Sequence, residues 1–160
     1  KEEIGVRLIS HTSELPSMTS KNFFHSVEFF RILEATPMQE PCMAVAEDKH
    51  GHVVAHMLTT IFYHRSFLPP AIYSHGRVYG EGEYRNQSER ETIFPMFLEA
   101  VTSRFKHHLC LYIEFSHLSS KMLGYEAFKS CGYFPVPWQE IHNSLHGTAP
   151  VVSGIHICGC

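Results

Sequence analysis

The sequence predicts a single α/β (α+β) domain in which helices lie on both faces of a mixed, mostly antiparallel central sheet. Apolar runs of strand length alternate with segments of helical periodicity in the order β-α-β-β-β-α-β-α-β. Short polar turns join the early strands and helices join the later ones, which predicts a meander followed by helical crossovers. A chain of 160 residues, 44% of them hydrophobic, is long enough for one such domain.

The first strand and the first helix are indicated by periodicity and by a cap. Residues 4–9 alternate apolar and polar side chains, which favours a short, partly exposed strand. Ser26 is a good N-cap residue, and an apolar stripe at helical spacing runs from there to about Thr36. Pro37 ends this predicted helix, because the residue before a proline avoids the helical region.

Three longer strands follow the first helix. Residues 42–47 and 53–63 are joined by a polar connection with one glycine, which predicts an antiparallel hairpin. Residues 71–79 form the next strand-like run, and we expect its alternation to place polar and aromatic side chains on one face. These side chains belong to Tyr73, His75, Arg77 and Tyr79.

The second half begins with a long helix predicted over residues 88–107. Ser88-x-x-Glu91 has the pattern of a capping box, although Pro95 suits a start nearer Glu91, since proline is favoured in the first turn. The apolar run from Leu109 to Phe115 then predicts a strand covered on both faces.

The last predicted helix and strand follow residue 118. Ser119-Ser120 offers an N-cap, Gly132 accepts a positive φ at the helix end, and Tyr133 begins the last strand. We expect no regular element from Gly147 onward. The predicted domain is therefore residues 1–146, followed by an irregular tail over residues 147–160.

Composition excludes several classes of partner. The net charge of −3 and the pI near 6.5 leave no basic footprint for DNA or for an anionic membrane, and no apolar run is long enough for a membrane span. Five cysteines, an odd number, with three in apolar segments, favour a reduced, cytoplasmic protein. His50 and His52, like His142 and His146, lack further ligands in register apart from Glu140, so no metal site is predicted.

One group of side chains stands out as a candidate site. His75, Arg77 and Tyr79 alternate along one strand face, and Glu114 and Ser116 of a neighbouring strand are placed to line the same cleft. Glu114 then has two interpretations. It serves as a general base whose pKa is raised by burial, or it is a strand-end residue that faces solvent or pairs with Arg77.

The order of elements and the segment Tyr125–Phe134, YEAFKSCGYF, resemble the closing helix and strand of the GNAT fold. Within that superfamily, FFHSVEFFRILEATP (residues 23–37), AVAEDKHGHVVAHMLTTI (44–61) and AIYSHGRVYGEG (71–82) are most similar to the first half of Fem-type aminoacyltransferases. These bacterial enzymes add amino acids to peptidoglycan precursors.

The resemblance implies an acyltransferase-like domain that binds a muropeptide-like acceptor, with aminoacyl-tRNA as the donor in a full-length protein. It also implies roles for single residues. It implies Tyr125 as the general acid that some GNAT enzymes place on this helix, for which packing in the core is the alternative. The positions that resemble acceptor-binding ones are Arg31, Tyr73, His75 and Arg77.

The sequence departs from the CoA-binding pattern of the superfamily. CoA-using GNAT enzymes carry Arg/Gln-x-x-Gly-x-Gly/Ala, whose backbone N–H groups hold the pyrophosphate. Here Arg85–Arg90 reads RNQSER, with Ser88 and Arg90 at the small positions, so no cofactor is predicted. Two alternatives stay open. The chain is a free-standing N-acyltransferase that uses acyl-CoA through an atypical loop, or it is a non-catalytic binding module that forms a homodimer.

Overall fold

The computed structural model describes residues 4–69, 71–106, 110–118, 124–137 and 155–159, and it confirms the predicted fold class. The strands and helices occur in the predicted order, with two further strands, β5 and β8. Their bounds are β1 Gly5–Ile9, α1 Val27–Glu34, β2 Gln39–Glu47, β3 Val53–Arg65, β4 Ile72–Tyr79, β5 Glu83–Tyr84, α2 Arg90–Lys106, β6 Cys110–Ser116, α3 Tyr125–Ser130, β7 Tyr133–Pro137 and β8 Ile155–Gly159.

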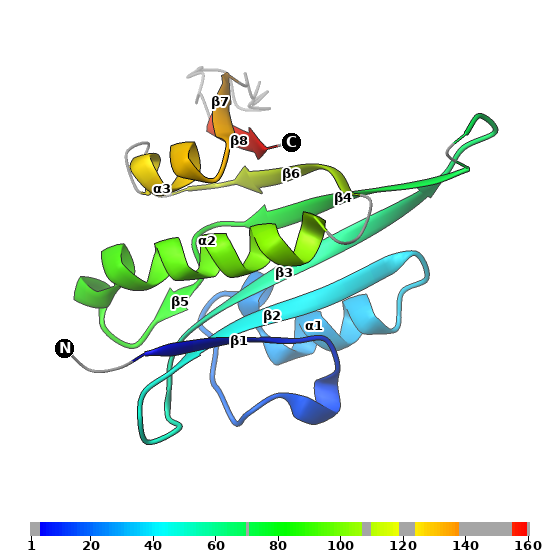
Figure 1. Cartoon of the computed structure of the whole chain (residues 1–160). Helices are drawn as coiled ribbons and strands as arrows, with labels where there is room; N and C mark the ends of the chain where they lie inside the picture. Colours follow the sequence, from blue (N-terminus) through cyan, green and yellow to red (C-terminus); the bar gives the residue numbers. More distant parts are fainter. Residues whose placement is uncertain (1–3, 70, 107–109, 119–123, 138–154, 160) are drawn as a thin grey trace, which may run out of the picture.

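The sheet is continuous from one edge of the molecule to the other, in the order β1-β2-β3-β4-β6-β8-β7 (Figure 1). The short strand β5 pairs with the start of β3. Strands β4 and β6 run parallel, because α2 carries the chain back between them, and the other described pairs are antiparallel. The β2–β3 pairing confirms the predicted hairpin.

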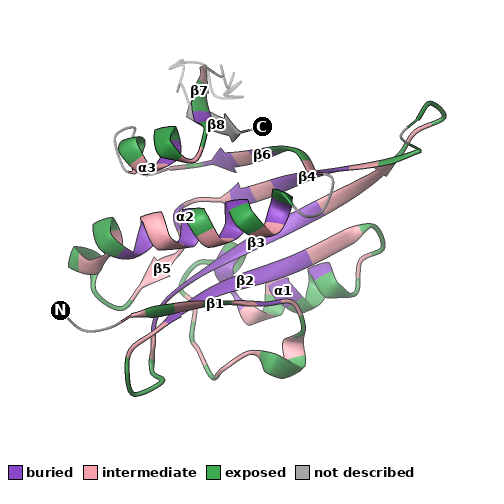
Figure 2. Cartoon of the chain, in the orientation of Figure 1, coloured by how far each residue is buried: buried purple, intermediate pink, exposed green. Residues whose placement is uncertain are grey.

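Each face of the sheet has its own apolar core. Helix α2 packs on one face with a row of buried side chains: Ile93, Phe94, Phe97, Leu98, Val101 and Phe105. On the other face, α1 buries Phe30 and Leu33 against residues of β1, β2 and β3. The buried residues therefore run through the middle strands (Figure 2). Helix α1 packs on β2 and does not cover β4 and β6 on that face of the sheet.

The capping predictions hold at α1 and shift at α2. The Ser26 hydroxyl accepts a hydrogen bond from the Phe29 N–H at 3.1 Å, as predicted for the N-cap of α1. Helix α2 begins at Arg90, after a 3₁₀ turn over Gln87–Glu89, so the predicted start at Ser88 was wrong and the later alternative is correct. Gly132 has a φ of +87°, as expected after α3.

Other predictions need correction or lie outside the described residues. Strand β6 is not covered along its whole length, since Leu111 is 56% exposed. A strand was not expected after Gly147, yet β8 lies between β6 and β7. The predicted cap at Ser119-Ser120, the domain boundary at residue 146 and the histidines His142 and His146 lie outside the described residues.

Candidate functional site

The candidate site lies on the α1 side of the sheet, beyond the part that α1 covers. Three neighbouring strands, β3, β4 and β6, supply its side chains. We call this surface the aromatic face and define it by Phe62, His64, Tyr73, His75, Arg77, Tyr79, Tyr112 and Glu114. The alternation of side chains along each strand puts them all on one surface.

Strand register brings the residues predicted for this site next to one another. Arg77 and Glu114 are partners in the parallel β4–β6 pairing, and Tyr79 is the partner of Ser116. His75 lies on the same face of β4 as Arg77 and Tyr79. The structure therefore places the five residues of the sequence-derived constellation on adjacent strands.

A stack of nearly parallel rings surrounds His75. Its ring centroid lies 4.8 Å from that of His64, 5.1 Å from that of Phe62 and 5.0 Å from that of Tyr112. His64 in turn stacks on Tyr73 at 5.0 Å. His64 Nε2 and His75 Nδ1 are 2.9 Å apart, so the N–H of one imidazole donates to the bare nitrogen of the other.

The environment of His75 keeps this imidazole neutral at pH 7. Burial lowers the pKa of His75, and the neighbouring His64 and Arg77 lower it further, which outweighs the opposite effect of Glu114. A neutral imidazole such as that of His75 can accept a proton from a group that lies against it. The arrangement thus provides a base beside the aromatic rings.

Arg77 and Glu114 form an ion pair inside the aromatic face. The guanidinium Nε and Nη2 both lie 3.2 Å from the Glu114 carboxylate, and Nη1 donates to the Tyr79 hydroxyl at 3.1 Å. Burial lowers the pKa of Arg77, but the hydrogen bond to Tyr79 and the charge of Glu114 outweigh burial and raise it. Of the two interpretations of Glu114, the geometry matches the pair with Arg77.

Arg77 also lies against two rings. Its guanidinium carbon is 5.7 Å from the ring centroids of both Phe62 and Tyr79, within cation–π range. Phe24, from the turn before α1, stacks on Tyr79 at 5.0 Å and extends the surface past the end of β4. His117 lies 6.1 Å from Tyr79 on the other side.

Ser116 marks the end of the site. Its side chain is 1% exposed, and its hydroxyl has no hydrogen-bond partner among the described residues. Its carbonyl accepts a hydrogen bond from the Gly80 N–H at 2.6 Å, which continues the contact between β4 and β6 by one residue. Ser116 is therefore placed as predicted, next to Tyr79.

Two predicted site residues lie elsewhere. Arg31 is exposed on α1, which packs on β2, two strands away from β4 in the sheet. Tyr125 begins α3 on the α2 side of the sheet, where it lines a hollow of about 360 Å³ with Phe94 and Pro95. It is 45% exposed, so the alternative of core packing was wrong. The structure does not bring Tyr125 to the face that holds Glu114.

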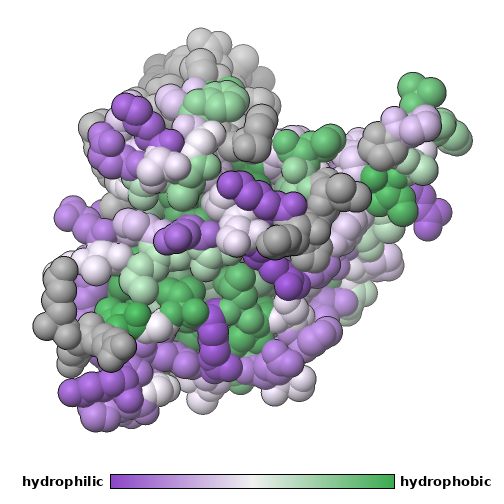
Figure 3. Space-filling view, viewed as in Figure 1, coloured by the Kyte–Doolittle hydropathy of each residue, from purple (hydrophilic) through white to green (hydrophobic). Residues whose placement is uncertain are grey.

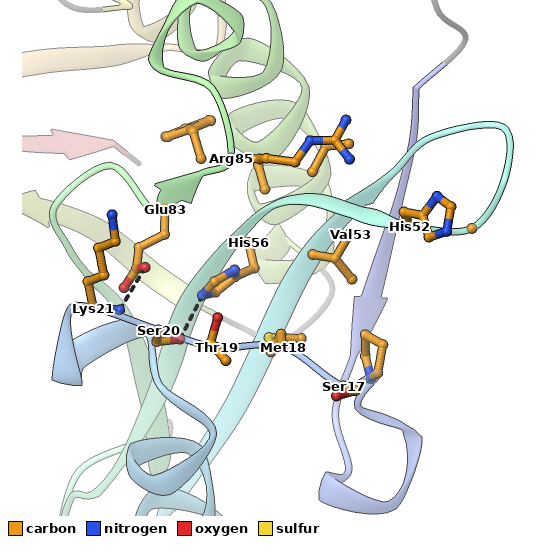
Figure 4. Close-up of a pocket in the computed structure, with 15 residues that line it drawn as sticks. Ser17, Met18, Thr19, Ser20, Lys21, His52, Val53, His56, Glu83 and Arg85 are labelled. Atoms are coloured by element: carbon orange, nitrogen blue, oxygen red, sulfur yellow. Dashed lines mark hydrogen bonds between the residues drawn. The ribbon is translucent and has the colours of Figure 1, made fainter.

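A hollow of about 700 Å³ lies between residues 16–21, the start of β3 and β5 (Figure 4). The Ser20 hydroxyl lies 2.8 Å from His56 Nε2 and donates to the His25 carbonyl at 3.0 Å. The Glu83 carboxylate accepts hydrogen bonds from the backbone N–H groups of Lys21 and Asn22, at 2.9 and 2.6 Å. These contacts anchor residues 20–22 to the sheet and do not activate Ser20 as a nucleophile.

The connection between β4 and α2 does not fit a pyrophosphate. The Glu89 N–H donates to the Asn86 carbonyl at 3.1 Å, and the Arg90 N–H donates to the Gln87 carbonyl. A phosphate at the start of α2 would thus find these two donors occupied. One Glu89 carboxylate oxygen is also buried there without a partner among the described residues, and it would repel an anion.

The arginines of this connection are also engaged. Arg90 pairs with Glu81 at 3.0 Å, and Arg85 lies 3.7 Å from Asp48. Both cations are therefore held by carboxylates of the same chain. The residues at this connection therefore do not form an open anion site of the kind that the Arg/Gln-x-x-Gly-x-Gly/Ala pattern provides.

The described part of the chain offers neither a metal-binding cluster nor a membrane-crossing helix. No group of three or more His, Cys, Asp or Glu side chains there has a geometry that could hold a metal ion. None of the helices over those residues is long and apolar enough to cross a membrane. Its free thiols are those of Cys42, Cys110 and Cys131, and burial raises the pKa of the Cys42 thiol to about 11.

Comparison with solved structures confirms the GNAT-like fold. A GNAT-family acetyltransferase from Streptococcus pneumoniae aligns over 98% of both chains with a TM-score of 0.57 and 10% identity. A chain of the NatC complex bound to Gag peptide and CoA aligns over 98% of this chain and 97% of that chain, with a TM-score of 0.59 and 11% identity. A GNAT acetyltransferase from Elizabethkingia anophelis with acetyl-CoA bound aligns over 96% and 97%, with a TM-score of 0.54 and 10% identity.

At these identities the comparisons show the fold alone. No protein-family model matches the sequence, and no curated protein matches it significantly. Nothing in these matches links the chain to Fem-type aminoacyltransferases. Three residues of the aromatic face, Phe62, His64 and Tyr112, were also missed from the sequence, as was Phe24 beside it. The alternation within residues 53–63 and 109–115 held the signal for Phe62 and Tyr112, and its continuation by one residue past Tyr63 held it for His64.

Proposed function

We propose that this domain takes part in the transfer of an acyl group to an amine, and that the aromatic face binds the amine acceptor. The fold supports acyl transfer, since the matched structures are acetyltransferases. The position of the acceptor rests on one observation, which is that the Glu114 carboxylate pairs with Arg77 on a face where that guanidinium lies against the rings of Phe62 and Tyr79. A carboxylate beside ring faces is suited to an ammonium group, because both attract a cation.

The aromatic face also contains a group that can accept the proton that the ammonium group must lose. Glu114 holds the ammonium, and His75, which is neutral and hydrogen-bonded to His64, accepts its proton. The free amine attacks the acyl carbonyl and a C–N bond forms. The bond to the leaving group then breaks, and the leaving group takes up the second proton that the nitrogen gives up. Arg77 fixes the Glu114 carboxylate and balances its charge through all these steps.

The donor is proposed to be held without the usual pyrophosphate loop, because the β4–α2 connection is filled by its own contacts. An aminoacyl ester is the donor that the sequence resemblance implies. The finer proposal is therefore the acceptor-binding half of a Fem-type aminoacyltransferase that acts on a cell-wall precursor. The competing proposal, an acyl-CoA donor, is favoured by the acetyl-CoA and CoA bound in the matched structures.

Calorimetry tests the acceptor and the donor separately. The acceptor probe is a peptidoglycan stem pentapeptide that contains lysine. We expect this peptide to bind and its Nε-acetylated form not to bind, because acetylation removes the cation. Glu114→Gln keeps the shape of the side chain but removes its charge, and should weaken binding about tenfold or more. Glu99→Gln, on the exposed side of α2, is the matched control.

Each part of the proposal has its own contradicting result. Equal binding of the acetylated and free peptides, or equal binding by the Glu114→Gln variant, would refute an acceptor site at Glu114. Titration with acetyl-CoA should give no heat of binding. Micromolar affinity for acetyl-CoA would refute the proposed donor and leave the acceptor site standing.

A further inference from the structure

We propose that the tip of the β3–β4 hairpin inserts into the surface of a lipid bilayer that contains anionic lipids. The hairpin extends beyond the other strands as an arm (Figure 1). At its end, Phe67 is fully exposed, Leu68 is 75% exposed, and Ile72 on the returning strand is 55% exposed. The space-filling view shows hydrophobic residues at the end of this arm (Figure 3).

Two backbone N–H groups of the tip have hydrogen-bond partners within the turn itself. The Ser66 N–H donates to the Ala71 carbonyl at 2.8 Å and closes the turn. The Leu68 N–H donates to the Ser66 hydroxyl oxygen at 3.1 Å. Insertion of the tip would therefore not strip these two donors of their partners, which is a main cost of placing loops among lipid chains.

The charge of the hairpin favours binding to an anionic lipid surface, although the whole chain has a net charge of −3. Residues 49–80, which include the entire hairpin, contain no Asp or Glu. Their charged residues are Lys49, Arg65 and Arg77, and Arg65 is exposed directly before the turn. Arg77 is paired with Glu114, and Lys49 lies in the β2–β3 turn at the other end of β3, so the cation of the arm is Arg65, which lies next to the tip at the level of the lipid headgroups. The overall pI conceals this asymmetry.

The shape of the tip favours lipid over a protein partner. Phe67 and Leu68 project from the end of a narrow arm, so a protein would need a matching cavity to bury them, whereas a bilayer deforms around them. Ile32 provides a contrast. It is 52% exposed but lies singly on α1 between Arg31 and Glu34 of the same helix, as scattered surface apolar residues commonly do.

Co-sedimentation of the full chain with vesicles tests the proposal. We expect binding to vesicles of phosphatidylcholine with about a third phosphatidylserine, and much weaker binding to phosphatidylcholine alone. The double variant Phe67→Ser/Leu68→Ser should lose binding about tenfold or more. Ile32→Ser, which removes an equally exposed apolar side chain elsewhere, should bind as the unchanged protein does. Arg65→Gln should reduce both the binding and its dependence on salt.

Three results would overturn the proposal. They are failure of the unchanged protein to bind anionic vesicles, equal binding by the double variant, and equal loss of binding in the Ile32→Ser variant. Sedimentation velocity without lipid tests the alternative that the tip binds a second copy of the chain. Self-association that the double variant abolishes, without vesicle binding, would assign the tip to contact between copies of the chain.

Discussion

At the scale of single residues, close packing of neighbouring side chains requires a glycine at position 76. A Cβ built on Gly76 would lie 2.3 Å from a ring atom of Phe105 and 3.3 Å from a methyl of Ile113. Gly76→Ala should therefore destabilise the fold by about 1–3 kcal/mol through overpacking between α2 and the sheet. Urea unfolding measures this difference. Gly5→Ala is the control, since nothing lies within 4 Å of its added Cβ, and equal stability of the two variants would contradict the close approach.

His25 makes the stability of the fold depend on pH. Burial, followed by the neighbouring His56, lowers the pKa of His25 to about 4, whereas in the unfolded chain it stays near 6.5. The unfolded state therefore takes up the proton first as the pH falls. The stabilisation is complete above about pH 6.5 and is lost progressively down to about pH 4, a change of about 3 kcal/mol.

Urea midpoints measured between pH 7.5 and pH 4.5 test this dependence. His25→Gln should lower stability at pH 7.5 but flatten its fall toward acid pH. The same exchange at His50, which is exposed in the β2–β3 turn, should leave the pH dependence unchanged. An equally steep fall in the His25→Gln variant would mean that other groups, such as His56, cause the acid sensitivity.

At the scale of elements, local signals in the sequence were sufficient where the structure is made by local contacts. Ser26 caps α1 through the hydrogen bond that its sequence position predicts, and Gly132 takes the positive φ expected of a helix C-terminus. The predicted hairpin between β2 and β3 is confirmed for the same reason. A capping box at Ser88 failed because a 3₁₀ turn, which the pattern does not distinguish, occupies those residues.

Partners distant in sequence were harder to predict. The strand β8 pairs with β6 and β7, and nothing within its own five residues specifies that place. For the site, alternation along residues 71–79 predicted which side chains share a face. It did not predict that Phe24, from the turn before α1, would stack on Tyr79, since this contact depends on where the whole segment packs.

At the scale of the whole molecule, β8 joins the end of the sheet to its centre. It is paired with β6 on one side and β7 on the other, so its loss would separate β7 from the rest of the sheet. A variant that ends before Ile155 should lose about 2 kcal/mol or more of stability, because the backbone hydrogen bonds of eight residue pairs are removed. For a chain of this size, the melting temperature should fall by roughly 4–8 °C.

Thermal unfolding followed by circular dichroism measures this effect. A variant that lacks only Cys160 is the control, because it keeps all the residues of β8. Removal of β8 also leaves β6 and β7 with unpaired edges, so the shortened chain should aggregate on heating at concentrations at which the control stays in solution. An unchanged melting temperature without aggregation would show that β8 adds nothing to the stability of the sheet.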